Sequence, residues 1–184
     1  MQSPAVLPLT SRYSPVAIVL QWLLAAALVG AFGVGVYMSD LPLSPTRLKL
    51  YNWHKWAGIC ILALSGLRLL WRLTHRPPAD VAMPAWQRQS AHAVHILLYL
   101  LFFAVPLAGW AYSSAAGFPI VVFGVLPLPD FVAPSKELAE AIKPAHKILV
   151  FTMALLVLAH VAAALKHHFV DGDGLLERMR PGRR

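Results

Sequence analysis

Eight histidines occur in a chain that is otherwise strongly apolar, and their spacing could support metal chemistry. His146 and His160 belong to one apolar segment, and about four helical turns separate them along the chain. In a helix both side chains therefore project from one face, about 21 Å apart. An ionisable residue inside a membrane-length segment is costly and by default marks function. The alternative for these histidines is a structural hydrogen bond.

Four segments are long and apolar enough to cross a bilayer, which takes about 20 residues each. Hydrophobic residues make up 58% of the 184-residue chain, and the mean hydropathy is +0.61. We therefore predict an all-α fold, a four-helix transmembrane bundle that forms a single membrane domain over residues 1–184. The predicted spans are 15–38, 51–73, 90–113 and 144–168, followed by a basic tail, 169–184.

The net charge of +8 follows the predicted topology and gives no reason to expect nucleic acid as a partner. Basic residues gather before the first span, around the second loop and in the tail, whereas the other two loops offset their basic residues with acidic ones. By the positive-inside rule both termini and the second loop face the cytoplasm, so the other two loops face the opposite, outer side of the membrane. The first span is too long for the apolar part of a cleaved signal peptide, about 7–15 residues.

This topology places His54 and His146 at one depth, near the outer ends of the second and fourth spans. Two imidazoles at one depth on facing helices can ligate a haem iron from both sides. Cys60 is the only cysteine, which excludes the C-x-x-C-H attachment of a c-type haem. His160 belongs to a second, inner level.

The spacing of about four turns recurs in the other helices. Gly35 follows Gln21 at this spacing and Gly109 follows His95 at the same spacing, so each glycine is expected at the level of the outer histidines. These glycines either let a flat macrocycle lie close to the helix or serve in ordinary helix packing.

Arg68 follows His54 at the same spacing and lies near the inner level. A guanidinium there suits a haem propionate, because it binds carboxylates through two hydrogen bonds. The alternatives are an interhelical hydrogen bond or extension of the side chain to the membrane interface.

Gln21 is expected opposite His160, where a second imidazole would complete an inner haem. Glutamine is a poor ligand for haem iron, so its amide either binds a propionate or His160, or makes an interhelical hydrogen bond. Another alternative is that the inner site is five-coordinate or empty. His92 and His95 open the third span, and either could replace the missing ligand or make polar contacts near the lipid headgroups.

Two connecting segments are distinctive. Residues 114–143 are apolar but too short and too rich in proline to span, so they either lie at the membrane interface or cover the bundle. Residues 135–143 predict a short amphipathic helix that leads to Pro144, and Pro106 is expected to kink the third helix.

The chain resembles the bacterial cytochrome b561 family, four-helix di-haem proteins related to hydrogenase cytochrome b subunits. The resemblance covers nearly the whole chain and is carried by "RYSPVAIVLQWL", "YNWHKWAGI", "LRLLWRLTHRPP", "AHAVHILLYLLFFAVPLAGW" and "PAHKILVFTMALLVLAHVAAALKHHFVDGDGLL". It implies two b haems, with His54 and His146 on the outer one and His160 on the inner one. The family's other inner ligand is a first-helix histidine, and Gln21 stands at that position here.

The resemblance implies a haem b electron carrier that passes single electrons between a periplasmic donor and the quinone pool. One family member, a superoxide:ubiquinone oxidoreductase, gives an enzymatic version in which ubiquinone is the acceptor. The competing hypothesis is a membrane anchor or subunit with one haem or none, which docks a redox partner. Membrane lipid is an expected partner in either case, and a second copy of the chain, in a homo-oligomer, is a further candidate partner.

Overall fold

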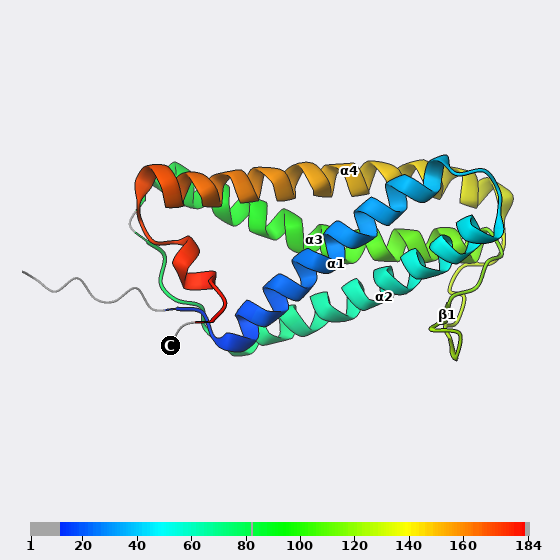
Figure 1. Cartoon of the computed structure of the whole chain (residues 1–184), viewed down its shortest axis with the longest axis horizontal. Helices are drawn as coiled ribbons and strands as arrows, with labels where there is room; N and C mark the ends of the chain where they lie inside the picture. The colour runs from blue at the N-terminus through cyan, green and yellow to red at the C-terminus, as the bar shows by residue number, and fades with distance from the viewer. Residues whose placement is uncertain (1–11, 82, 183–184) are drawn as a thin grey trace, which may run out of the picture.

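The computed structural model describes residues 12–81 and 83–182, and four long helices dominate it (Figure 1). They are α1 (Pro15–Asp40), α2 (Pro45–Thr74), α3 (Ala85–Ala115) and α4 (Lys136–Lys166). Each is long and apolar enough to cross a membrane, which confirms the predicted four-helix transmembrane fold. Most of the predicted polar lead before Pro15, and Arg183 and Arg184 of the basic tail, lie outside the described residues.

Serine residues start three of the helices. The hydroxyls of Ser14, Ser44 and Ser135 accept hydrogen bonds from first-turn backbone N–H groups at 3.3, 3.2 and 3.2 Å. Such caps satisfy N–H groups that have no partner within the helix. In α1 and α2 a proline follows the cap, where its fixed φ favours the first turn.

The fourth helix begins earlier than its predicted span. The predicted amphipathic segment is the first part of α4, and the helix runs through Pro144 without a break. The Ser135 cap and Glu137 in the first turn favour a start at this point. Proline removes one backbone hydrogen bond but does not end a helix whose flanking turns are held, and α3 likewise continues through Pro106.

The helices pack as two pairs, α1 with α2 and α3 with α4, joined through contacts between α2 and α3. In Figure 1, α1 crosses diagonally in front of the bundle, from the end of α2 toward the start of α4. A small apolar cluster of Leu101, Val105 and Met153 fills the interface between α3 and α4. Many large apolar side chains stay exposed along the helices, as expected of a surface that contacts lipid tails.

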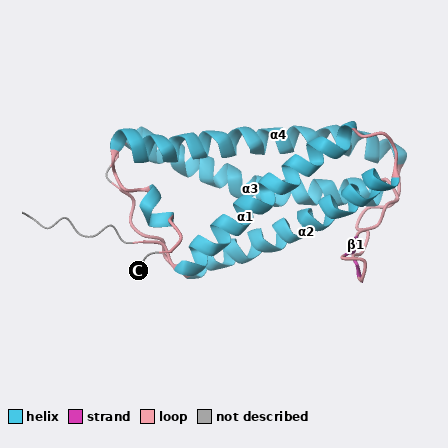
Figure 2. Cartoon of the chain, in the orientation of Figure 1, coloured by secondary structure: helices cyan, strands magenta, loops and turns pink. Residues whose placement is uncertain are grey.

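We name the two ends of the bundle by the predicted orientation. The inner end carries both described chain termini, and the outer end carries a small β-hairpin of β1 (Val121–Val122) and β2 (Leu126–Pro127), which Figure 2 shows as the one sheet of the described chain. The hairpin lies within the long apolar loop and was not predicted.

The segment after α4 folds back onto the inner end. A π turn (His167–Asp171) and a 3-10 turn (Leu176–Met179) follow the helix, and the indole N–H of Trp22 donates to the carbonyl of Met179 at 2.9 Å. His167 pairs with Asp173 at 2.6 Å, and Lys166 pairs with Asp171 at 2.7 Å. The predicted tail therefore packs against the start of α1.

Candidate haem site

His54 of α2 and His146 of α4 face each other in the outer half of the bundle. Their ring centroids are 6.5 Å apart and their planes are nearly perpendicular, at 87°. Metal–imidazole bonds of about 2 Å place two rings on opposite sides of one metal with centroids roughly 6 Å apart. The observed separation therefore fits two axial ligands of one iron. We call these two residues the outer pair.

Backbone carbonyls hold both rings of the outer pair. Nδ1 of His54 lies 3.0 Å from the carbonyl oxygen of Ala31, and Nδ1 of His146 lies 3.1 Å from that of Val105. A carbonyl oxygen only accepts hydrogen bonds, so Nδ1 carries the proton in both rings. The lone pair of each ring is then on Nε2, which is the tautomer that a metal ligand needs.

Two glycines make room for these rings. A Cβ atom added to Gly35 would lie 3.0 Å from Cε1 of His54, and one added to Gly109 would lie 3.0 Å from Cε1 of His146. Each glycine comes about one turn after the carbonyl that holds the ring. The other described glycines have no such neighbour within 4 Å. Gly35 and Gly109 therefore let the imidazoles lie directly on the backbones of α1 and α3.

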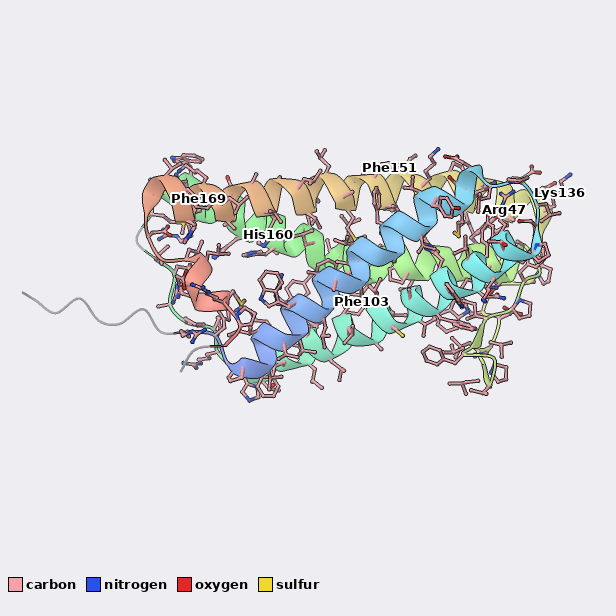
Figure 3. All side chains as sticks on the ribbon, in the orientation of Figure 1. Arg47, Phe103, Lys136, Phe151, His160 and Phe169 are labelled. Atoms are coloured by element: carbon pink, nitrogen blue, oxygen red, sulfur yellow. The ribbon has the colours of Figure 1, made fainter. Side chains whose placement is uncertain are left out.

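A second pair of imidazoles, the inner pair, consists of His95 of α3 and His160 of α4. The ring centroids are 5.3 Å apart at an interplanar angle of 63°. Figure 3 labels His160 on the inner half of α4. No hydrogen bond from within residues 12–81 and 83–182 holds either ring. A separation of 5.3 Å is about 1 Å shorter than two ligands on one iron require.

The other two predicted site residues, Arg68 and Gln21, lie on α2 and α1. The Arg68 guanidinium lies over the ring of Tyr99, 5.8 Å from its centroid, and Tyr99 follows His95 by about one turn on α3. Among the described residues Arg68 has no carboxylate partner, and the half-buried Gln21 amide has no hydrogen-bond partner. The structure thus places Arg68 near the inner pair, and within the described residues Gln21 and His160 form no hydrogen bond.

Ser65 was missed by the sequence reasoning. It is fully buried, and within the described part of the chain its hydroxyl has no hydrogen-bond partner. It follows His54 by about three turns and so shares the face of that histidine. A buried hydroxyl without a partner is costly in an apolar bundle, which makes it a candidate to bind a polar group of a cofactor.

Comparison with known proteins agrees with this geometry. The family model of the prokaryotic cytochrome b561 matches residues 12–182. The chain belongs to the prokaryotic cytochrome b561 family. Three similar proteins cover nearly the whole chain, which supports the same assignment.

Two of these relatives are from Escherichia coli (strain K12). Cytochrome b561 homolog 2 is 34% identical over 91% of this chain and 90% of its own length, and cytochrome b561 homolog 1 is 33% identical over 95% and 99%. The third, from Yersinia pestis, is described as a probable superoxide oxidase CybB and is 31% identical over 94% and 98%.

Membership in the cytochrome b561 family establishes the general properties of the protein. It is a multi-pass protein of the bacterial inner membrane that binds haem b and takes part in membrane electron transfer. The outer pair consists of two imidazoles that carbonyl hydrogen bonds hold at a separation that suits one iron, whereas within the described chain the inner pair has no such hydrogen bond and a shorter separation.

Proposed function

We propose that this cytochrome b561 holds one haem b between His54 and His146 and passes single electrons from a periplasmic donor toward the quinone pool. The observation that carries the proposal is the outer pair itself, whose facing rings are both fixed by carbonyl hydrogen bonds. A bound haem iron would supply the reversible one-electron chemistry. The protein contributes the two ligands, their orientation and an apolar enclosure.

The carbonyls of Ala31 and Val105 do more than orient the rings. Because each carbonyl accepts a hydrogen bond from Nδ1–H, the opposite ring nitrogen becomes a stronger electron donor to a metal. Both histidines of the outer pair donate such a hydrogen bond. The stronger ligands would favour the oxidised form of the iron and tight binding of the haem. Gly35 and Gly109 maintain it by keeping side chains out of the space that the rings occupy.

We propose that a second haem b lies at the inner level and is held by His160 alone. His95 lies too close to His160 to bind the opposite side of the same iron, and Gln21 offers an amide in place of the family's imidazole. We assign His95 and Gln21 to polar contacts with the edge of this haem. The Arg68 guanidinium, which has no carboxylate partner within the described chain, is proposed to bind a propionate.

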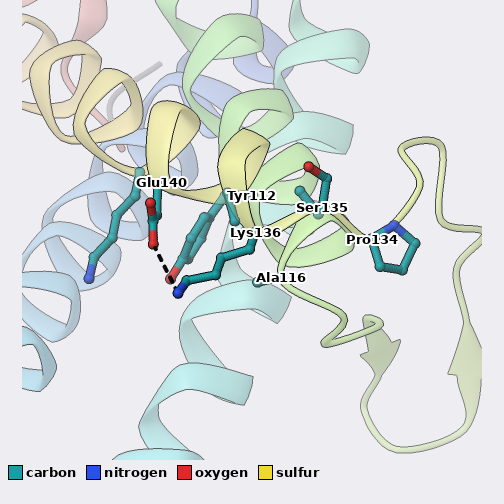
Figure 4. A pocket seen from close by; sticks show the side chains of 9 residues that line it. Tyr112, Ala116, Pro134, Ser135, Lys136 and Glu140 are labelled. Carbon is teal, nitrogen blue, oxygen red and sulfur yellow. Dashed lines mark ion pairs between the residues drawn. The ribbon is translucent and has the colours of Figure 1, made fainter.

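Superoxide is the donor that we propose for the outer haem. The Yersinia pestis relative is described as a probable superoxide oxidase. At the outer end, a pocket of about 500 Å³ is lined by residues of α3 and α4 that include Tyr112, Lys136, Glu140 and Lys143 (Figure 4). Lys136 pairs with Glu140 at 3.9 Å, which leaves Lys143 as the cation that can attract a small anion.

This pocket lies close to the outer pair along both helices. Tyr112 follows Gly109 by about one turn, and Lys143 precedes His146 by about one turn. Two superoxide ions would be oxidised to dioxygen while one quinone takes up two electrons and two protons. The basic inner end supports the proposed orientation, with both termini in the cytoplasm.

The test is the haem content of the purified protein together with superoxide-driven quinone reduction. Two haems per polypeptide, one low-spin and one high-spin, and superoxide-dependent quinone reduction would support the whole proposal. One low-spin haem without that activity would support the outer haem only. The protein would then be an electron carrier without an inner haem, and its donor would not be superoxide. No haem in protein made with adequate haem supply would contradict the proposal and favour a membrane anchor that docks a redox partner.

A further inference from the structure

The hairpin segment, residues 118–128, presents an unusually apolar surface at the outer end of the bundle. No charged residue occurs between positions 114 and 129. Phe123 and Val125 are exposed to 64% and 80%, and Phe118 and Leu126 are also exposed. Exposed apolar groups at this density mark a surface that meets a partner or a membrane.

One face of the hairpin segment is fixed to the bundle. Ile120 and Val122 are buried, and the indole N–H of Trp56 donates to the carbonyl of Val121 at 2.7 Å. The ammonium group of Lys55 donates to the carbonyls of Phe118 and Pro119 at 3.3 and 3.2 Å. The exposed face is therefore the side turned away from the helices.

These contacts set the depth of the hairpin segment along α2. Lys55 and Trp56 lie about 15 Å from the start of that helix. They mark the point where its charged outer part ends, because no charged residue follows until Arg68. Trp53 and Trp56 also lie here, as expected at a membrane–water interface. Figure 1 shows the hairpin leaving the bundle sideways at this end, across the helix axes.

The turn of the hairpin holds an aromatic residue in a costly conformation. Phe123 and Gly124 have φ angles of 51° and 76°, so both central residues are in the left-handed region of a type I′ turn. Asparagine or glycine is favoured at the first of these positions, and a bulky side chain there is an outlier. The Phe123 ring packs beside Trp56, with centroids 5.5 Å apart.

We propose that the hairpin segment inserts its exposed face into the interfacial region of the outer lipid leaflet. The segment is held against α2 by Lys55 and Trp56 and lies at the level of the α2 tryptophans. It has no charge with which to recognise a protein partner, whereas lipid requires only apolar contact. Insertion also accounts for the strained backbone at Phe123, because this turn places the aromatic ring at the membrane interface.

The experiment uses the full chain in lipid nanodiscs with nitroxide labels on single cysteines. Because Cys60 is the only cysteine, C60A provides the background. Labels at F123C and V125C are compared with K136C, an exposed charged position at the start of α4, and with L155C, an exposed apolar position within the span. Collisions with dioxygen, which concentrates in lipid, are measured against collisions with a water-soluble nickel chelate.

The proposal predicts that both hairpin labels favour dioxygen severalfold more than the label at position 136 and approach the ratio at position 155. Collision ratios equal to those at position 136 would overturn it, because the hairpin would then lie in water. Protection from both reagents would also overturn it and would indicate cover by a second copy or another protein. The outcome does not depend on haem content.

Discussion

The two histidine pairs of this cytochrome b561 differ in how the protein holds them. In the outer pair, each ring is fixed by a carbonyl of a neighbouring helix, and a glycine makes room for it. In the inner pair, the rings touch edge to face and no described residue anchors them by a hydrogen bond. The outer rings are 6.5 Å apart and the inner rings 5.3 Å apart.

This difference shows that the presence of two histidines at one level does not determine whether they are suited to bind one iron. Both levels offer two imidazoles inside an apolar bundle, but within the described chain only the outer rings are held in one tautomer at a spacing that suits one iron. Two helices supply the outer histidines, and the other two supply the carbonyls that orient them. At the inner level, no carbonyl of the described chain holds either ring by a hydrogen bond.

The largest effect is expected from removing an outer ligand. H54A or H146A should abolish the low-spin haem and lower the haem content, because the remaining imidazole gives the iron only one protein ligand and holds the haem less tightly. Haem extraction and reduced-minus-oxidised spectra measure both quantities. H92A is the control, because His92 is exposed and pairs with Asp80 at 3.4 Å. Retention of the low-spin haem in both ligand variants would refute the assignment.

The glycines provide the next test. G35A and G109A should weaken the outer haem by roughly 10- to 100-fold, as changes to groups that support metal ligands commonly do. The added methyl would lie 3.0 Å from an imidazole carbon and force the ring to move. Haem titration of the apoprotein measures the affinity.

The matched control is G33A on the same helix, where an added Cβ has no neighbour within 4 Å. This change should leave haem binding intact and stabilise α1 by up to about 1 kcal/mol, the helix-propensity difference between alanine and glycine. Equal effects of G33A and G35A would mean that the close approach of His54 is unimportant.

A smaller effect is expected at Arg68. R68Q should weaken binding of the inner haem by roughly tenfold. A hydrogen bond to a charged group contributes about 1.5–3 kcal/mol, and the lower end applies because the glutamine amide can still donate one. The outer haem should be unaffected. Titration with separate low-spin and high-spin signals distinguishes the two haems, and K49Q, at an exposed position near the outer end of the same helix, is the control. Loss of the outer signal in R68Q would contradict the placement of Arg68 at the inner level.

The smallest change in haem content, but a clear change in spin state, is expected from Q21H. An imidazole at this position should supply the missing ligand and convert the inner haem from high-spin to low-spin. Electron paramagnetic resonance of the oxidised protein detects the conversion. If the inner haem is already low-spin in the unaltered protein, another residue is its second ligand and His95 becomes the first candidate.

The sequence predicted the bundle and the outer pair because both follow from periodicity. Span length predicted the four helices, and topology placed His54 and His146 at one depth. The recurring spacing of about four turns also placed Gly35 and Gly109 at that level, and the structure brings them against the two rings.

Other features depend on tertiary packing and could not be predicted in this way. The carbonyls of Ala31 and Val105 have no signature in residue type, because every residue has a carbonyl. His95 was a candidate, but its contact with His160 depends on how α3 packs against α4. The hairpin could not be predicted because Phe123 occupies a turn position at which asparagine or glycine would have indicated a hairpin.

The most direct test of the central claim is rescue of the outer ligand by free imidazole. H54G should lose the low-spin signal in electron paramagnetic resonance, and added imidazole should restore it by occupying the space left by the side chain. That result would show that the ring acts as an iron ligand and not only as a packing group. An unchanged low-spin signal in H54G, before any imidazole is added, would contradict the account.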